Sequence, residues 1–513
     1  MLKSFKYQMS ITPFRQTVTP LGPYRDVRPI SRLNYDILWQ IFNLNTLTDT
    51  DIVQNDSENH EMSLITARHT SQVCADWRSL MLASSSLWAN TINLQHLNQR
   101  NDDWRGEILK RTTNSLLTII GHLEAGWPTS QFFLSLLDGQ WTRLRRISVH
   151  VHGKAVAKDK RWLSIQSPAP NLEIFCIRFV STSAFSTLDD TLFSDTAPSI
   201  HTLITHNINF KFSGRWLSSL HSLDLSGCSV RKTILFALAD MLSLESLNMT
   251  NVDIVDTDAE DHSWPMIILP QLKLLSLSVD LGTLAVLIGY IAPTPRCIFK
   301  YEYSNSTIAP PSANDIFLLL RGLSAHFQCF FDFWLYDMLF WTMTKYMIDL
   351  KTDCSGLFFH IDIDSGSDWH GIPDIILHSL HYCNLSSITN LELHVSPDPL
   401  DPSNVQLSEL CRSLSPVEVM HTDSQIMEVL IQLQEELDGM TLFPNLHSVV
   451  FDTDAELKCD AIQRFILQRR DAGVPIAEFD LSDCTSPNQD RLLFLEGING
   501  LDVEWNQDIR NGM

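Results

Sequence analysis

The chain has 513 residues, 44% of them hydrophobic, so it has enough apolar material to fold but is too long for one ordinary compact core. Several domains and an elongated repeat array are both compatible with this length. Its 37 Lys and Arg against 60 Asp and Glu give a formal net charge of -23, the wrong sign for a surface that neutralises nucleic-acid phosphates or an anionic membrane.

Cysteine usage and the apolar segments indicate the compartment. Ten cysteines are scattered singly between Cys74 and Cys484 without a Cys-x-x-Cys pair, which is typical of a reducing environment. Residues 1–20 contain no apolar run long enough for a secretory signal, and charged residues interrupt the two most apolar regions, 266–292 and 315–348. We therefore expect an intracellular protein, cytoplasmic, nuclear or both, with neither nucleic acid nor membrane as a partner.

The first predicted element is a short amphipathic helix in RLNYDILWQIF, residues 32–42. Asn34 is suited to cap its start, and Asp36 is favourably placed near the positive helix end. A polar, acidic segment follows at 43–62. The apolar residues that share one face of this helix are Leu33, Ile37, Leu38, Ile41 and Phe42.

A second amphipathic helix is predicted in VCADWRSLM, residues 73–81, with Thr70 or Ser71 as its cap. Cys74 falls on the apolar stripe, which favours a buried structural thiol. The serines at 84–86 break the pattern before Leu87 and Trp88 give a second apolar anchor. Helices of this length are marginal alone in water, so they must pack on each other or on a partner.

Residues 31–90 resemble the F-box in the form common in large fungal families. The resemblance lies in three motifs in this order: Leu-x-x-x-Ile-Leu-x-x-Ile-Phe, Val-Cys-x-x-Trp-Arg and Leu-Trp. The resemblance implies docking onto the Skp-type adaptor of a cullin-RING ubiquitin ligase. Asn34 stands where that family usually has proline, and the segment 43–62 is inserted. The alternative is a generic helical hairpin that caps a larger domain. The residues that we place against the adaptor, unless they are buried inside the module itself, are Leu33, Ile37, Leu38, Ile41, Val73 and Trp77.

After residue 140 the sequence becomes periodic. Lines of the form L-x-x-L-x-L or similar recur, mostly 20 to 30 residues apart, with helix-like stretches such as 233–242 and 423–437 between them. Cys228, Asn251 and Cys484 sit where such a motif closes. The predicted strand lines begin at residues 144, 172, 220, 244, 272, 298, 328, 358, 388, 417, 446 and 476.

This periodicity resembles leucine-rich repeats, in which each unit supplies a strand and a return helix. The predicted fold class is α/β: a short N-terminal helical F-box followed by a solenoid with a curved parallel sheet and outer helices. A doubly wound α/β enzyme also alternates strand and helix, but no glycine-rich phosphate loop is present. The predicted divisions are a tail (1–27), an F-box-like module (28–95), a helical connector (96–140) and about a dozen repeats (141–513).

No constellation of residues predicts catalysis or a cofactor. His378 and His381 in HSLHYC share a helix face with apolar residues, which favours core or surface histidines over a metal site. His150 and His152 alternate along a strand, and His201 and His206 are five residues apart, without a nucleophile signature. We expect no catalytic residue, no metal and no cofactor.

Target binding is expected on the concave sheet face, because alternate strand residues point away from the core. That face is polar and mildly acidic, although plain solvent exposure is the alternative at each position. The candidate residues are Ser222, Asp224, Ser226, Ser246, Asn248, Thr250, Asn390, Glu392, His394, Glu478, Asp480 and Ser482.

The combined resemblance implies a substrate-recognition subunit of an SCF-type ubiquitin ligase, with the repeats holding a target protein that the sequence does not identify. The alternatives are a non-degradative repeat scaffold with a degenerate F-box and an enzyme that uses the repeat face as a cleft.

Overall fold

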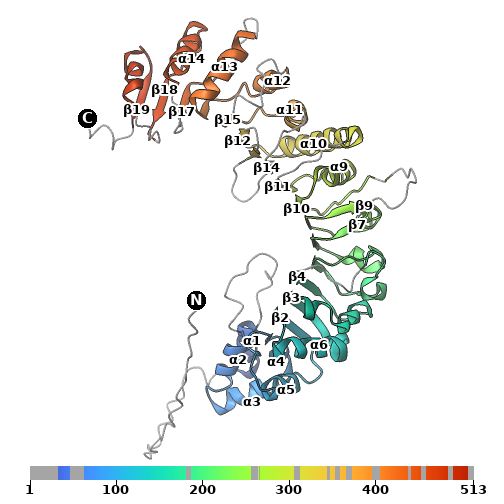
Figure 1. The fold of residues 1–513 in the computed structure, drawn as a ribbon. Coiled ribbons are helices and arrows are strands. Elements are labelled where there is room, and N and C mark those ends of the chain that lie inside the picture. The colour runs from blue at the N-terminus through green and yellow to red at the C-terminus, as the bar shows by residue number, and fades with distance from the viewer. Residues whose placement is uncertain are drawn as a thin grey trace, which may run out of the picture.

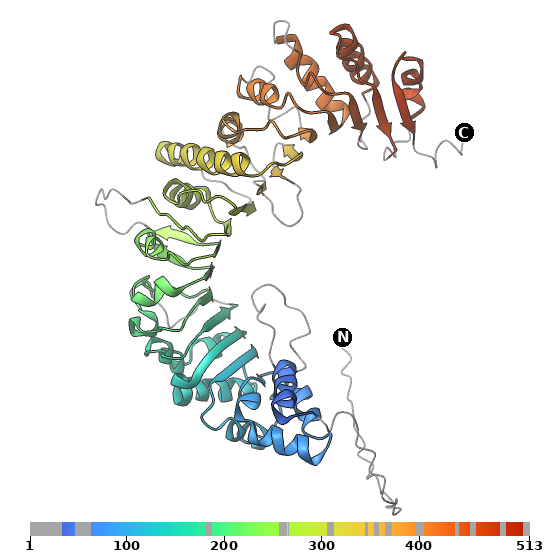
Figure 2. The same cartoon turned by 180° about the vertical axis from the view of Figure 1, so that it is seen from behind.

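Strands line the inner side of a long arc and helices cover its outer side (Figure 1). Seen from behind, the N-terminal helices lie at one end of the arc and the last strands at the other (Figure 2). This architecture confirms the predicted α/β class, a long, mostly parallel sheet alternating with helices as in a leucine-rich-repeat-like solenoid. The computed structural model describes residues 33–46, 63–180, 187–255, 264, 266–304, 312–343, 347–352, 359–364, 372–395, 405–436, 441–451, 458–482 and 489–505.

One sheet of 17 strands runs the length of the arc, and two further strands, β7 (Ser229–Arg231) and β9 (Asp253–Val255), form a separate parallel pair. The pairings put the strands of the large sheet in the spatial order β1 (Ile92–Asn93), β2 (Leu117–Leu123), β3 (Leu144–Val151), β4 (Ile174–Phe179), β5 (Thr202–His206), β6 (Ser222–Ser226), β8 (Ser246–Thr250), β10 (Leu274–Ser278), β11 (Ile298–Ser304), β14 (Phe359–Asp364), β13 (Met347–Lys351), β12 (Met338–Met343), β15 (Asn390–Val395), β16 (Val419–Thr422), β17 (Ser448–Phe451), β18 (Glu478–Leu481) and β19 (Asp502–Trp505).

The strands stack in register, which explains how the repeats share one core. In β6, β8 and β10 every second side chain is buried, the period of a strand with one face on a core. The pairing places Leu223 beside Leu247, and Leu247 beside Leu275, all fully buried. Burying such a side chain contributes about 1.5–3 kcal/mol, so each repeat is stabilised mainly by covering its neighbours.

Neighbouring strands are parallel except around β13, which runs antiparallel to β12 and β14. The predicted strands that begin near 298 and 358 are β11 and β14. The predicted strand at 328 is wrong, because that segment lies in helix α10 (Ala313–Phe333). Its buried Phe327, Phe330 and Phe331 are spaced as one helix face, and a short apolar run cannot separate the two possibilities by pattern alone.

Helices of very different lengths return the chain along the outer side (Figure 1). In the part of the chain that the structure describes, the return elements include the 3-10 helices η3 (Trp141–Arg143), η4 (Lys160–Gln166), η5 (Leu192–Asp195), η6 (Arg215–Ser219) and η7 (Gln489–Gly497). The α-helices of the solenoid are α5 (Asp103–Arg111), α6 (Pro128–Gln140), α7 (Lys154–Ala157), α8 (Ile234–Ala239), α9 (Leu281–Tyr290), α10, α11 (Ile372–His381), α12 (Val405–Ser413), α13 (Ser424–Glu436) and α14 (Cys459–Asp471).

The N-terminal module consists of α1 (Tyr35–Thr46), α2 (Ser63–Thr70), α3 (Ala75–Ala83) and α4 (Ser85–Ala89). Asn34 caps α1 as predicted, since its Oδ1 accepts a 3.4 Å hydrogen bond from the backbone N–H of Asp36. Of the predicted insertion, residues 43–46 belong to α1 and 47–62 lie outside the described residues. Helix α2, which precedes Ser71, was not predicted.

The second predicted helix begins later than expected, at Ala75, and the predictions for its cap and its cysteine are wrong. Cys74 is exposed and is itself the N-cap, because its sulfur accepts a 3.4 Å hydrogen bond from the backbone N–H of Trp77. Thr70 and Ser71 instead lie at the end of α2. The predicted serine break is confirmed at Ser84 alone, because Ser85 and Ser86 already belong to α4. Trp88 beyond it is fully buried, with Nε1 donating to the Met81 carbonyl at 2.8 Å.

The segment 96–140 is not purely helical, contrary to the prediction. Helices α5 and α6 flank strand β2, whose residues pair in parallel with β3. Strand β1 pairs with β2 in turn, so the sheet already begins directly after α4. The sequence of β2 does not alternate between apolar and polar residues, so the strand was not recognised. Ile120 is apolar and buried although it points to the inner face.

Among the described residues one helix, α10, is long and apolar enough by length and composition to cross a membrane, a property that core helices of soluble proteins share. One face of α10 packs against α9 and α11. Its exposed positions include Arg321 and Asp332. The packing thus gives α10 the environment of a core helix.

Candidate docking surfaces

The N-terminal module leaves several large apolar side chains in solvent. Ile37 on α1 is 46% exposed, and Val73, just before α3, is 62% exposed. Leu33 and Ile41 are exposed as well. Four of the six residues predicted to contact the adaptor therefore lie on the surface of the module, where an apolar group gains by being covered.

The other two predicted residues point inward. Leu38 is only 6% exposed and belongs to the core of the module, so its placement against the adaptor needs correction. Trp77 is half-buried, and its ring meets the buried ring of Phe42 edge-on at 4.8 Å between centroids. The sequence spacing correctly placed Leu38 and Trp77 in helices, α1 and α3. Only packing decides which side of a small helix faces its neighbours.

Eleven of the twelve predicted target-binding residues lie in strands, at positions that alternate with buried ones and so face away from the core, and Ser482 lies in the turn directly after β18. Register brings six of them into one cluster, because Ser222, Asp224 and Ser226 of β6 stand beside Ser246, Asn248 and Thr250 of β8. The three residues of β15 and those around β18 form two separate groups, with β16 and β17 between them.

The group on β15 is a small charged network. His394 Nε2 lies 3.6 Å from Glu392 Oε1, and its Nδ1 lies 3.8 Å from Asp423 Oδ2. Further along, Asp480 stands beside Glu504 of β19, and Glu478 beside Asp502. The C-terminal part of the inner face is therefore acidic, as the sequence predicted for the whole face.

The N-terminal part of the inner face carries the opposite character, which sequence reasoning missed. We call His122, His150, Arg178 and His206 the His–Arg row, because strand pairing places each beside the next on β2, β3, β4 and β5. They follow one another at intervals of 28 residues, a signal present in the sequence. None of the inner-face positions of these four strands is acidic.

The side chains of the His–Arg row contact one another. The rings of His122 and His150 have centroids 4.8 Å apart, and His152 lies 5.7 Å from His122. Arg178 Nη1 is 3.0 Å from His150 Nε2. Because a guanidinium has no acceptor, Arg178 donates and His150 Nε2 accepts, which places any single ring proton of His150 on Nδ1.

Burial and the neighbouring charges shift the protonation of His206, in the row, and of Asp224, beside it. Burial lowers the pKa of His206, and Arg178 lowers it further while Asp224 opposes. Burial raises the pKa of Asp224, against a hydrogen bond from Asn248 and the charges of Arg178 and His206. Asp224 therefore marks the end of the cationic region and partly offsets Arg178.

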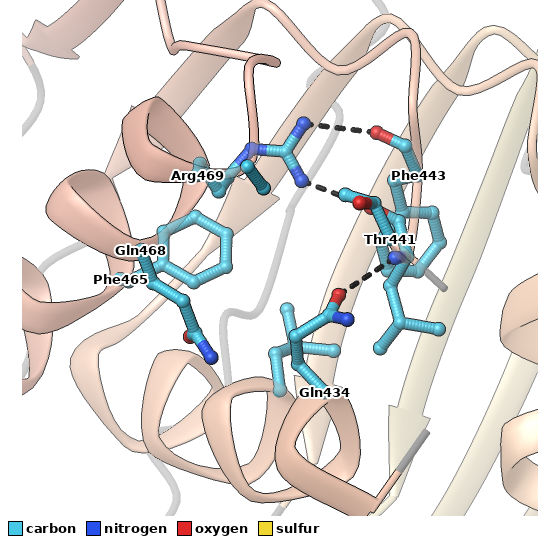
Figure 3. Close-up of a pocket in the computed structure, with 9 residues that line it drawn as sticks. Gln434, Thr441, Phe443, Phe465, Gln468 and Arg469 are labelled. Carbon is cyan, nitrogen blue, oxygen red and sulfur yellow. Dashed lines mark hydrogen bonds between the residues drawn. The ribbon is translucent and has the colours of Figure 1, made fainter. Parts of the chain in front are cut away.

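A hollow of about 390 Å³ lies on the outer side between α13 and α14 (Figure 3). Its polar groups hold the loop that leads to β17: Gln434 Oε1 accepts from the backbone N–H of Leu442 at 2.8 Å. Arg469 donates to the carbonyls of Leu442 and Phe443 at 2.9 and 3.0 Å and also to that of Leu446. Burial lowers the pKa of Arg469 to about 10. These contacts indicate a structural role.

The histidines of HSLHYC lie on α11, as predicted, and His381 Nδ1 is 3.5 Å from Glu409 Oε2. Within the described ranges no three side chains of His, Cys, Asp or Glu are gathered so that they could hold a metal ion. Cys228 is buried, Asn251 adopts a left-handed φ of 50°, and Cys484 lies outside the described residues.

In comparisons with known proteins, no family model matches the chain and no curated protein matches it.

Proposed function

We propose that this chain is the substrate-recognition subunit of an SCF-type cullin-RING ubiquitin ligase. Its N-terminal module docks on a Skp-type adaptor, and the inner face of the solenoid holds a target protein. In this proposal the chain needs no catalytic residue, because it acts by holding a target lysine near the ubiquitin-conjugating enzyme. The support is the apolar surface of Leu33, Ile37, Ile41 and Val73 at one end of a solenoid with a polar inner face.

That surface favours a docking module over a simple cap of the solenoid. A cap would bury its apolar side chains on the first repeats, as Trp88 does, whose buried ring lies 4.5 Å from the guanidinium of Arg111 on α5. Ile37 and Val73 instead lie in solvent on a module whose own core is already complete. Fully covering such a side chain contributes at most about 1.5–3 kcal/mol, less for one that is already half-buried, so the exposed residues together add a favourable apolar contribution to docking.

A pull-down with recombinant adaptor tests the proposal. The double variant Ile37→Glu/Val73→Glu places two charges on the docking surface and should reduce adaptor recovery at least about tenfold. The matched control is Leu163→Glu, an equally exposed leucine of the solenoid, which should bind like the wild type. Equal recovery of all three proteins would contradict the docking surface, provided that circular dichroism shows each to be folded.

A non-degradative scaffold with a degenerate F-box is a second candidate. The observation that favours it is the inward placement of Leu38 and the packing of Trp77 on Phe42, which remove two predicted contacts from the surface. A folded wild-type protein that recovers no adaptor would support the scaffold. Its partners would then be those that copurify through the solenoid alone.

A further inference from the structure

We propose that the His–Arg row binds oxyanions carried by a segment of the target protein, and that this binding strengthens as the pH falls. The inference rests on the proposed function only in taking the ligand to be a target protein. It deepens that function by assigning a chemistry to one part of the inner face, the strands β2 to β5.

The charges on the N-terminal strands differ from those of the rest of the chain. The chain has a formal net charge of -23, yet the inner-face positions of β2 to β5 hold two permanent cations, Arg146 and Arg178, three histidines and no carboxylate. Arg146 lies 3.3 Å from Glu173, which directly precedes β4, whereas Arg178 belongs to the His–Arg row. A guanidinium matches carboxylate and phosphate oxygens with paired donors. The acidic C-terminal part of the same face would repel an anionic segment, so this segment is directed to the N-terminal strands.

The side chains of the His–Arg row are spaced along a line across the sheet. The four side chains occupy one register position on four adjacent parallel strands, which lie about 4.8 Å apart. An extended segment laid across the strands can therefore place oxyanions against Arg178 and a neighbouring imidazole at the same time. The 3.0 Å contact from Arg178 Nη1 to His150 Nε2 holds the guanidinium at this position before a ligand arrives.

The protonation of His206 sets the direction of the pH dependence. Burial and Arg178 lower the pKa of His206, so its imidazole is neutral at neutral pH. A bound anion favours the imidazolium form, so binding takes up a proton and the affinity increases as the pH falls. Among the described residues, the charged and titratable groups around the row are His122, His150, His152, Cys176, Arg178 and His206, opposed by Asp224.

Fluorescence anisotropy on the full chain tests the proposal with three labelled peptides of one design, containing glutamate, phosphoserine or glutamine at the same positions. We expect the glutamate and phosphoserine peptides to bind and the glutamine peptide not to bind. Whichever anionic peptide binds more tightly identifies the source of the oxyanion. Equal binding of the glutamine peptide, or tighter binding of a single-stranded oligonucleotide, would overturn the assignment.

Variants locate the site. Arg178→Gln should weaken binding of the anionic peptides about tenfold, the effect of losing one charged hydrogen bond. His421→Asn, on β16 in the other half of the inner face, should leave it unchanged. Asp224→Asn removes the opposing carboxylate and should tighten binding several-fold, a gain that misfolding cannot produce. An unchanged affinity in Arg178→Gln, or an equal loss in His421→Asn, would contradict the row.

The pH experiment uses the glutamate peptide, because its carboxylates stay ionised above about pH 5. Its affinity should rise several-fold between pH 7.5 and 5.5, and His206→Asn should flatten this rise. A pH-independent affinity would overturn the coupling. Adaptor recovery by Arg178→Gln should equal that of the wild type, so loss of anion binding and loss of adaptor docking are distinguishable.

Discussion

Buried polar side chains fix the conformation of loops at two places on the outer side of the solenoid. Arg469 holds three backbone carbonyls between α13 and β17. His326 on α10 is buried, with Nε2 lying 3.1 Å from the carbonyl oxygen of Ile291, where α9 ends. Each side chain directs polar atoms at backbone carbonyls beyond the end of a helix, and such a hydrogen bond is the usual condition for burying a polar group.

His326 makes stability depend on pH. Burial lowers its pKa to about 4, although the hydrogen bond to Ile291 opposes, whereas an unfolded histidine titrates near 6.5. Between these values the unfolded chain binds a proton that the folded chain does not. The contribution of neutral His326 to the free energy of unfolding is therefore complete above pH 6.5 and is lost as the pH falls toward 4. The loss amounts to about 3 kcal/mol.

Urea unfolding at pH 7 and pH 5 measures this effect. The wild type should lose more unfolding free energy on acidification than His326→Gln, which keeps a donor for Ile291 but does not titrate. A variant with the same pH dependence as the wild type would show that other groups dominate.

At the scale of elements, close approach of two helix backbones shapes the middle of the solenoid. A Cβ added at Gly322 of α10 would lie 2.7 Å from the backbone oxygen of Ile288 on α9. A Cβ at Gly289 of α9 would lie 2.9 Å from Leu318 of α10. Glycine on both sides thus lets α9 and α10 touch, and the long α10 can cover β11 and β14.

Gly322→Ala should lower the unfolding free energy by about 1–3 kcal/mol, because backbone atoms cannot move aside as a flexible side chain does. Gly106→Ala is the matched control: Gly106 also lies in a helix, α5, but has nothing within 4 Å of the added Cβ. That change should be neutral or stabilising by up to about 1 kcal/mol. Equal effects of the two substitutions in thermal unfolding would contradict the close packing.

For the whole molecule, the arc means that each repeat contacts mainly the repeats beside it. Strand pairing runs from one neighbour to the next, and the helices on the outer side pack in the same sequence, α9 on α10, α10 on α11 and α13 on α14. In such an array the free energy of unfolding is approximately the sum of contributions from each repeat and its contacts with its neighbours. A destabilising substitution at one end therefore affects mainly the repeats at that end.

Arg469→Ala tests this locality. Removing the guanidinium takes a charged donor away from three backbone carbonyls and should cost about 1–3 kcal/mol within the last repeats. Hydrogen exchange should accelerate in α13, β17 and α14 while β3 to β6 keep their wild-type protection. Arg464→Ala, on the same helix but exposed and paired with the exposed Glu435, should change neither region. Acceleration throughout the chain would instead indicate one cooperative unit.

Sequence reasoning succeeded where the physical signal is local. The alternation in LHSLDLSGC and LESLNMTN predicted β6 and β8 and the inner-face positions of Ser222 to Thr250, because a strand with one buried face must alternate. It failed at 328, where a helix face of phenylalanines looks like a strand, and at β2, where a nearly continuous apolar run hides the alternation.

The sequence by itself determined the repeat period, the strand and helix alternation and the two amphipathic helices at the N-terminus, since these follow from the chemistry of neighbouring residues. Only the tertiary structure decided which apolar residues of the module face inward, as Leu38 does, and which side chains of distant strands meet. His122, His150, Arg178 and His206 are neighbours because parallel strands stack in register, and contact between residues so far apart along the chain is a property of packing.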